Sequence, residues 1–467
     1  MPLDLLYGQL GYNGLPPAAW WSGGRGIADL ERAVERERRS PMDFTVMRDV
    51  FATAHADSVV LACDVHGDFI TLYAKVRGVR VERVFRNRTD SIVEELEGMK
   101  ATARKAGIKY VLLVAEPTGV HHRVLMRVAE ALGMETAWVS GEHVSKMRVV
   151  ETNDTGKTDT KDPKVIHTLA RMGKTLRHRS LVEPYNLLRE WHKTYDAAED
   201  NVVAAKCALH NVVRAVFPDL GFSKDFKFGL AGCVLGRRYG FNPYRIGPMR
   251  PSRLSAALRK AGVRIQASTL EELVERARVS AQKGPGEREA TVLESRVVQL
   301  YEDLDLHQKR KEKAKAAMVE LYREARKLDP KLPEGVHGVI STFYLARIVA
   351  ETGPLSDFPS ARQLLRFAGL NLRERNSGKS RGKTKISKKG RTLLRKVQIH
   401  MVLPMVREDA VYGEYYARLR KSGLPGTKAM TAVARHFLKV LYGWYRSGAA
   451  FDRDRMFTCE SQYTQVA

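Results

Sequence analysis

Residues 58–87, SVVLACDVHGDFITLYAKVRGVRVERVFRN, decide the fold class of this chain. They contain three short runs rich in apolar and β-branched residues, SVVLACDV, FITLYAK and VERVFRN, in quick succession. Runs of this length and composition are typical of β-strands, and their close succession predicts a meander of three strands.

The segments that follow alternate between helical and strand-like patterns. Residues 89–105 carry apolar side chains on one helical face, and residues 109–116, KYVLLVAE, form the continuous apolar run of a buried central strand. A second helix, the strand TAWVS and a third helix complete the unit. Three strands, helix, strand, helix, strand, helix is the element order of an RNase H-like fold. We expect this α/β unit over residues 56–180, after an N-terminal extension over residues 1–55.

A different period governs the middle of the chain. Over residues 188–216, and again over residues 293–328, apolar residues recur at alternating spacings of three and four. This spacing predicts two heptad helices, and hence a coiled-coil region over residues 181–330 that carries a basic insertion and forms a hairpin or a dimerisation arm. We expect a mainly helical third unit over residues 331–450 and a C-terminal tail over residues 451–467.

The charge balance indicates a polyanionic partner. Of the 467 residues, 79 are Lys or Arg and 53 are Asp or Glu, which gives a net charge of +26 and a pI near 9.9. This excess favours nucleic acid as the partner. No membrane partner is expected, because no apolar run reaches the roughly 18 residues of a membrane span. The four cysteines lack zinc-site or disulfide spacing, which fits a reducing cytoplasm.

Four acids of the expected α/β unit are candidate metal ligands. Asp64 ends the first strand, Glu116 ends the central strand, and Asp159 and Asp162 lie three apart where the last helix begins. Acids at a helix start are also common as caps, so spacing alone leaves capping and metal binding open for the last pair. In this fold the first and fourth strands are neighbours and the last helix packs beside them, so the four acids can converge. Four carboxylates suit a hard cation such as Mg²⁺, which can activate a nucleophile at a phosphodiester.

The strongest local charge lies in residues 372–396, LRERNSGKSRGKTKISKKGRTLLRK, which hold eleven basic side chains and one acid. We call this segment the basic stretch. A charge density of this kind follows a phosphate backbone, and a solvated surface loop is the alternative interpretation. The residues expected to contact nucleic acid are Arg373, Arg375, Lys379, Arg381, Lys383, Lys385, Lys388 and Lys389.

The motifs of both regions resemble the insertion sequence 110 family of transposases, also called bridge RNA-guided recombinases. The D-E-D-D layout of the acids has AEPTG around Glu116 and GKTDTKD around the last pair. Residues 335–395 are similar to the family's C-terminal transposase domain, which runs from a Gly-rich turn through ARQL and AGL to a Ser-Gly and ISKxGxxxLR. The resemblance covers residues from about 58 to 450. It has one departure, Pro163, where alanine commonly follows the last Asp.

The resemblance implies a cofactor, a mechanism and partners. It implies a RuvC-like domain whose four acids bind Mg²⁺, and a transposase domain whose serine attacks a DNA phosphate and holds the strand as a phosphoserine ester. Ser377 aligns with the family's Ser-Gly and is the expected nucleophile; Ser380 and Ser387 are rivals, and Ser387 has the pattern of a helix N-cap. A guide (bridge) RNA that pairs with target and donor DNA is also implied. So is a homo-oligomer, with dimers assembling into a tetramer and active sites shared between protomers, at the nucleoid of a prokaryotic cytoplasm.

Two other functions stay open from the sequence. The carboxylates acting with water alone would make a hydrolytic DNA nuclease of the junction-resolvase type, in which the serine domain only binds DNA. A non-catalytic nucleic-acid scaffold would require the four acids to be incidental, which their joint placement argues against. A covalent protein–DNA adduct separates the recombinase from the nuclease.

Overall fold

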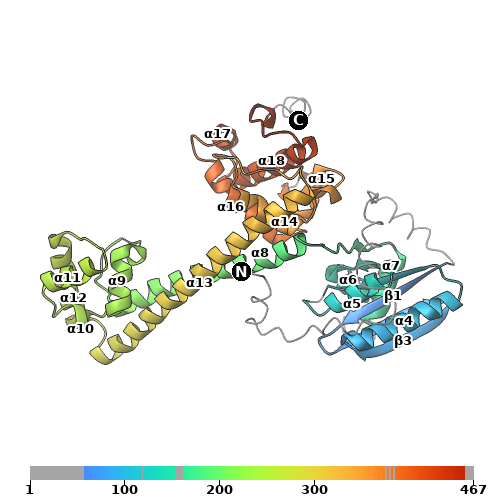
Figure 1. Ribbon diagram of the computed structural model, residues 1–467, viewed down its shortest axis with the longest axis horizontal. Coiled ribbons are helices and arrows are strands. Elements are labelled where there is room, and N and C mark those ends of the chain that lie inside the picture. The colour runs from blue at the N-terminus through green and yellow to red at the C-terminus, as the bar shows by residue number, and fades with distance from the viewer. Residues whose placement is uncertain are drawn as a thin grey trace. The chain divides into compact units, whose positions relative to one another are not determined.

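The computed structural model describes residues 57–117, 119–152, 161–223, 225–373, 376–377, 380–381 and 384–457. The chain divides into two compact units, Met1–Ser180 and Leu181–Ala467 (Figure 1). Each unit buries apolar cores of its own.

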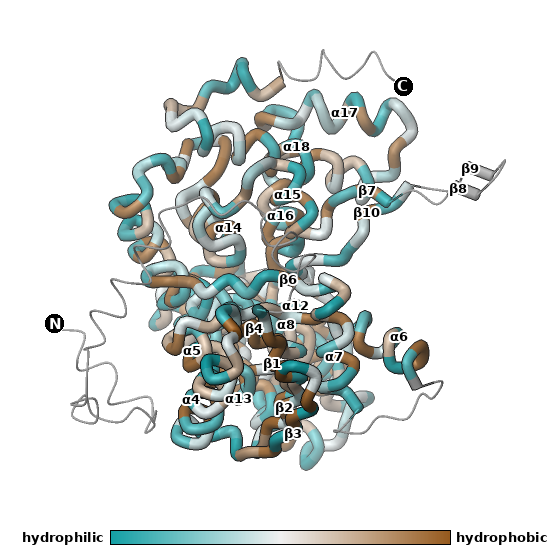
Figure 2. The backbone as a smooth tube through the Cα atoms, turned by 90° about the vertical axis from the view of Figure 1, so that its right-hand side faces the viewer, coloured by the Kyte–Doolittle hydropathy of each residue, from teal (hydrophilic) through white to brown (hydrophobic). Residues whose placement is uncertain are grey.

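The first unit is built on a six-stranded mixed sheet. Strands β1, β2 and β3 pair in antiparallel fashion, which confirms the predicted meander. β4 joins β1 and β5 joins β4 in parallel, and β6 closes the edge antiparallel to β5. The central strands are apolar over most of their length (Figure 2). In the sheet order β3-β2-β1-β4-β5-β6 the strands are Val79–Arg86, Phe69–Val76, Ser58–Val65, Tyr110–Ala115, Glu135–Trp138 and Leu176–Arg177.

Helices cover both faces of this sheet. Leu61 and Cys63 of β1 lie in the core that α4 and α5 share with one face, and Val60 and Ala62 lie in the core that α7 shares with the other. Because successive side chains of a strand point to opposite faces, Asp64 continues the row on the α7 face. The helices are α4 Thr89–Lys105, α5 Arg123–Ala131, α6 Gly141–Thr152 and α7 Asp162–Arg171. The order from β1 to β5, with α4 and α5 between the strands and α7 after them, is the one predicted from the sequence. The helix α6 before α7 and the two-residue edge strand β6 were not predicted.

Two long helices form the axis of the second unit. α8 (Tyr185–Val216) and α13 (Glu287–Leu328) pack along each other in opposite directions, since each end of α8 shares a core with the opposite end of α13. Most residues at the predicted spacing are buried, but Leu328 is 67% exposed. Tyr301 and Tyr322, outside that spacing, are fully buried, and each hydroxyl donates a hydrogen bond to a backbone carbonyl group at 2.7 Å. Such a bond makes a buried phenol tolerable.

The segment between the long helices, expected only as a basic insertion, folds as a small helical bundle. Its core includes Leu235, Phe241 and Leu254, packed with Val297 and Tyr301 of α13. The bundle therefore rests on one end of the long helix pair. Its elements are η2 Phe226–Phe228, α9 Leu230–Tyr239, α10 Pro243–Ile246, α11 Pro251–Lys260 and α12 Ala267–Lys283.

The C-terminal part is mainly helical, as predicted, and shares one core with the other end of the long pair. Its helices are α14 Thr342–Thr352, η3 Leu355–Asp357, α15 Ala361–Phe367, α16 Thr392–Met405, α17 Gly413–Lys421, α18 Gly426–Ser447 and η4 Asp454–Met456. The basic stretch begins with two nested pairs of two-residue strands, β7 Leu372–Arg373 with β10 Lys385–Ile386 and β8 Asn376–Ser377 with β9 Ser380–Arg381. Within the described ranges, no helix has both the length and the apolar character needed to cross a bilayer.

Candidate functional site

Asp64 and Glu116 lie at the carboxyl ends of two neighbouring parallel strands. Cys63 of β1 is in register with Ala115 of β4, so the next residues along each chain, Asp64 and Glu116, come side by side. Strand alternation directs both toward the face that α7 covers. Asp64 is 4% exposed and Glu116 is half-buried. The predicted pairing of the first and fourth strands is confirmed, and it brings two of the candidate acids together.

Asp162 is the first residue of α7, but it does not cap the helix. Lys161 holds the N-cap position, and its side chain makes no capping hydrogen bond. Both oxygens of Asp162, which is 2% exposed, accept hydrogen bonds from Arg148 of α6, from Nε to Oδ1 and from Nη2 to Oδ2, at 2.8 Å each. α7 packs against β1, so this ion pair belongs to the same face of the sheet as Asp64. Asp159 lies outside the described residues.

Three further residues shape this site, and sequence reasoning missed their part in it. They are Arg148, His66 and Gly141. Nε2 of His66 lies 3.3 Å from Oδ2 of Asp64. Gly141, the first residue of α6, lies so close to Glu116 that a Cβ atom there would collide with Oε1. His66 could have been found from the sequence, because it stands two residues after Asp64 and so on the same side of an extended chain. Nothing in the sequence pattern pointed to Arg148 or Gly141, whose roles depend on how α6 packs.

Two titratable side chains of the first unit, Cys63 and His167, are held neutral. Burial, reinforced by the charge of Asp64, raises the pKa of the Cys63 thiol, so this group stays protonated and is unsuited to act as a nucleophile or a ligand. Burial, together with the positive charges of Lys75 and Arg171, lowers the pKa of His167 on α7 to about 4. Its imidazole is therefore uncharged near pH 7.

The chemistry of the acids fits Mg²⁺, which prefers carboxylate oxygens. Their arrangement fits in part, because Asp162 faces Arg148. Among the residues that the structure describes, no group of three or more His, Cys, Asp or Glu side chains converges. Asp64 and Glu116 could hold the ion, and Asp162 could join them only after leaving Arg148.

Ser377 and its rival Ser380 lie directly opposite each other. They are register partners in the antiparallel pair of β8 and β9. The sequence places only Gly378 and Lys379 between them, so these serines end the two arms of one tight hairpin. This neighbourhood makes Ser380 the natural control for any test of Ser377.

Two cations of the basic stretch face each other across a strand pair. Arg373 of β7 is in register with Lys385 of β10, and both are exposed. Like charges directly opposite destabilise a strand pair, so a phosphate between them would relieve the repulsion. Lys388 and Lys389 are exposed on the way to α16. Arg381 lies on β9 with its side chain outside the described part, and Arg375, Lys379 and Lys383 lie outside the described residues.

Close backbone contacts fasten the base of the basic stretch to the end of α15. The amide of Lys388 donates to the carbonyl oxygen of Gly369 at 3.0 Å. A Cβ atom at Gly390 would collide with the carbonyl oxygen of Phe367 and the amide nitrogen of Gly369. The glycines of the AGL and SKKG motifs are therefore required by close approach of two backbone segments.

The prediction of Ser387 as a helix N-cap was wrong. α16 begins at Thr392, and its N-cap position is Arg391. The Ser387 hydroxyl instead hydrogen-bonds with Asn371 Oδ1 and accepts from the amide of Lys389 at 3.3 Å. Ser387 is 9% exposed and serves a tight turn that begins after β10, five residues before the helix.

A buried charge network supports the end of the basic stretch. Glu351 of α14 is 2% exposed. Its Oε1 lies 3.0 Å from Nδ1 of His192, and its Oε2 lies 3.3 Å from Nε of Arg391. Arg347 Nε donates to His192 Nε2 at 3.2 Å, so Nδ1 carries the imidazole proton and donates to Glu351. Burial opposes ionisation of Glu351, but the hydrogen bond from His192 and the charge of Arg391 outweigh it and lower the pKa. The resulting anion positions Arg391.

Comparisons with known proteins match both regions. A family model for the DEDD domain of IS110-type elements, described as Transposase, matches residues 73–218. A second model, described as Transposase IS116/IS110/IS902 family, matches residues 337–417. Glu116 and Asp162 lie within the first range and Ser377 within the second, whereas Asp64 precedes the first. The protein is a transposase.

Relatives from insertion elements agree with these matches. The chain is 26% identical over 350 residues to an uncharacterized 44.8 kDa protein of insertion element IS116 from Streptomyces clavuligerus, covering 74% of this chain and 83% of the relative. It is 23% identical over 363 residues to an uncharacterized 43.6 kDa protein of IS110 from Streptomyces coelicolor, covering 76% and 87%. It is 27% identical over 301 residues to an uncharacterized 42 kDa protein of IS900 from Mycobacterium paratuberculosis, covering 63% and 73%. The chain belongs to the IS116/IS110/IS902 family of transposases.

Proposed function

We propose that this transposase is an RNA-guided DNA recombinase that cleaves and rejoins strands through a covalent phosphoserine intermediate on Ser377. One observation carries the proposal: a single chain combines two adjacent strand-end carboxylates with a Ser-Gly hairpin flanked by cations. The strand order supports an RNase H-like fold for residues 56–180, and the pairing of α8 with α13 supports a coiled-coil region. The guide RNA and the homo-oligomer rest on the family resemblance, and the net charge of +26 supports polyanionic partners.

In this mechanism the serine exchanges one phosphodiester bond for another. Ser377 Oγ attacks the DNA phosphorus, the bond to one strand's oxygen breaks, and the serine proton ends on that oxygen as a free hydroxyl group. A hydroxyl group of the second DNA then attacks the phosphoserine ester, which joins the new strands and restores the serine. The number of ester bonds is unchanged, so rejoining requires no external energy source. The cations of the basic stretch hold the phosphate oxygens in place.

The carboxylates act as the electrostatic partner of this serine. A serine hydroxyl is a weak nucleophile near neutral pH and needs activation. When bound, Mg²⁺ would supply Lewis-acid stabilisation of the phosphate. We assign Asp64 and Glu116 as its strand-end ligands, with Asp162 at the start of α7 and Asp159, three residues before it in the sequence, as the other two. The buried position of Asp64 and the close approach of Glu116 to Gly141 limit how far either carboxylate can move.

A hydrolytic nuclease is the second candidate function. The observation that favours it is the division of the chain into two compact units. The four acids belong to the first unit and Ser377 to the second, so the acids could cleave DNA with water while the second unit only binds. The two candidates differ in their products: a recombinase joins donor to target, and a nuclease leaves cut ends.

The test is a joining assay with purified protein, RNA transcribed from the ends of its element, and donor and target DNA with Mg²⁺. The proposal predicts a donor–target product that requires the RNA and moves to a new target when the pairing segment of the RNA is rewritten. Efficient cutting without joined product, in the presence of RNA, would contradict it and favour the nuclease.

A further inference from the structure

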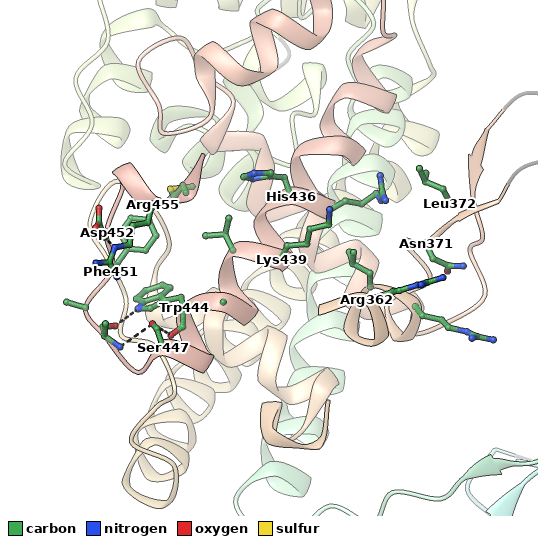
Figure 3. Close-up of a pocket in the computed structure, with 18 residues that line it drawn as sticks. Arg362, Asn371, Leu372, His436, Lys439, Trp444, Ser447, Phe451, Asp452 and Arg455 are labelled. Atoms are coloured by element: carbon green, nitrogen blue, oxygen red, sulfur yellow. Dashed lines mark hydrogen bonds and ion pairs between the residues drawn. The ribbon is translucent and has the colours of Figure 1, made fainter. Parts of the chain in front are cut away.

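A cavity of about 1320 Å³ opens in the C-terminal helical part of the second unit, beside α15 and α18 (Figure 3). This volume exceeds the roughly 300–1,000 Å³ of common small-molecule sites. Among its described residues, the basic stretch contributes Leu372 to the cavity lining, next to Asn371. α15 lies within the matched residues 337–417 and α18 lies beyond them, and the proposed function assigns no role to this cavity.

One side of the cavity is basic. The cations contributed by α15 and α18 are Arg362, Arg366, Arg435 and Lys439. None of them pairs with an acidic residue in the described part of the chain. Asp452, the one acid among the described lining residues, is 3.0 Å from Arg455. The positive charge on α15 and α18 is thus uncompensated and suits an anionic ligand.

Arg435 has a buried donor that lacks a hydrogen-bond acceptor in the described part of the chain. Its Nε is buried and has no hydrogen-bond partner among the residues that the structure describes. Burial lowers the pKa of its guanidinium, which shows that the surroundings disfavour the charge. A buried charged donor without an acceptor is costly, and a phosphate oxygen entering the cavity would satisfy it.

The other side of the cavity is aromatic. Trp444 and Phe451 lie there, across the cavity from Arg362, as Figure 3 shows. Their ring centroids are 4.9 Å apart at an interplanar angle of 60°. Trp444 Nε1 donates to the carbonyl oxygen of Ala449 at 3.0 Å, so the indole is held in one orientation. Next to it, Gly443 leaves open space where a side chain would stand.

We propose that this cavity binds a single-stranded nucleic-acid segment, with phosphates on the four cations and an unpaired base against Trp444 and Phe451. Cations that follow the backbone, combined with aromatic rings on which bases stack, are the usual means of holding a single strand. A duplex would bury the base faces within its own stack. The cavity volume gives room for more than one nucleotide. This is a binding site separate from the serine hairpin, so its test needs no cleavage or joining.

The test measures binding of the full chain to a labelled ten-nucleotide RNA, the DNA of the same sequence, and their duplexes. Gly443→Leu fills the open space beside Trp444 without removing any proposed contact, and should weaken single-strand binding at least tenfold. Gly98→Leu is the matched control, because Gly98 is also a helical glycine with open space around it, on α4. It should leave binding within twofold of wild type. A preference for RNA or for DNA identifies the source of the strand.

Two further measurements test the cations and the aromatic rings separately. Arg362→Gln with Lys439→Gln should lower the slope of log affinity against log salt by about 1.4, since each single-strand phosphate contact contributes about 0.7. A photoreactive thiouracil oligonucleotide should crosslink to Trp444 or Phe451 when the adduct is mapped by mass spectrometry. Unchanged single-strand affinity in Gly443→Leu, an equal loss for duplex, or crosslinks confined to the basic stretch would overturn the proposal.

Discussion

Asp64 and Glu116 lie at the carboxyl ends of two strands of a six-stranded sheet, whereas the described cations of the basic stretch lie on and around strands of only two residues. In the first region Asp162 is buried and has Arg148 as a partner at 2.8 Å. In the second region, cations such as Lys388 and Lys389 are exposed. One region holds a few charges in set positions; the other gathers many charges of one sign.

The difference follows from what each region is proposed to bind. A divalent cation requires carboxylate oxygens at defined places, which rigid strand ends and packed helices provide. A phosphate backbone is bound by the number of cations near it, and it tolerates a looser arrangement. Removing one charge from the acid site should therefore cost chemistry or stability. Removing several from the basic stretch should cost only affinity.

The largest effect is expected for the acids. Asp64→Asn, Asp159→Asn and Asp162→Asn should each slow DNA cleavage by about 1000-fold. A neutral amide is a poor ligand for Mg²⁺, so the variant loses the several kcal/mol by which the bound ion stabilises the transition state at the phosphate. RNA binding, measured by filter retention, should stay within twofold. Asp68→Asn is the control, since Asp68 is an exposed acid of the turn between β1 and β2. If Asp162→Asn melts lower but cleaves normally, Asp162 only pairs with Arg148.

Arg148→Met should have the next largest effect, and on stability. Removing one partner of a buried ion pair costs about 3–5 kcal/mol, because Asp162 keeps its charge without compensation. If Asp162 is a ligand, Mg²⁺ should restore part of this loss, so the rise in melting temperature with Mg²⁺ should be larger in the variant than in wild type. Lys146→Met, at an exposed site on the same helix, should change neither value. An equal Mg²⁺-dependent rise in Arg148→Met and wild type would count against Asp162 as a ligand.

Neutralising the basic stretch should lower affinity without lowering stability. Changing Lys383, Lys385, Lys388 and Lys389 together to Gln should reduce the salt slope of duplex binding by up to about 3.6, and affinity at low salt by about 100-fold. The melting temperature should not fall. The charge-matched control changes exposed cations of α13, namely Lys309, Arg310, Lys313 and Lys327. A salt slope equal to wild type would show that this stretch touches no phosphate.

The smallest effect is expected from a single methyl group. Gly141→Ala should push the Glu116 carboxylate aside and slow cleavage about tenfold, since misplacing a catalytic group by a fraction of an ångström already costs rate. Gly98→Ala, in open space on α4, should cleave at the wild-type rate. Wild-type cleavage by Gly141→Ala would mean that the position of Glu116 does not matter to the chemistry.

The sequence predicted the first unit well, because its strands carry strong local signals. Residues 111–115, VLLVA, are apolar throughout, and polar or glycine-containing segments separate the strands. The element order then implied that the first and fourth strands pair, which brings Asp64 beside Glu116. The pair of Arg148 with Asp162 could not be predicted, because these residues are joined by the packing of two helices and by no recurring spacing.

The second unit shows where local patterns mislead. Helices α9 to α12 were missed because no continuous period links them, and three of them, α9, α10 and α11, have ten residues or fewer. Ser387 has the residue type of a cap, yet Gly390 brings the chain against Gly369 and delays the start of α16 to Thr392. Long-range backbone contact decided the local structure there.

The central claim is the covalent bond between Ser377 and DNA, and one measurement tests it directly. Protein, RNA and labelled DNA would be incubated with Mg²⁺, denatured in detergent and digested with nuclease and trypsin. Trypsin cuts after Lys379, so Ser377 and Ser380 fall on different peptides, residues 376–379 and 380–381. The account predicts a nucleotide on the first peptide in wild type and in Ser380→Ala, and no adduct in Ser377→Ala. A nucleotide on another serine, or efficient cutting with no adduct in any variant, would contradict it.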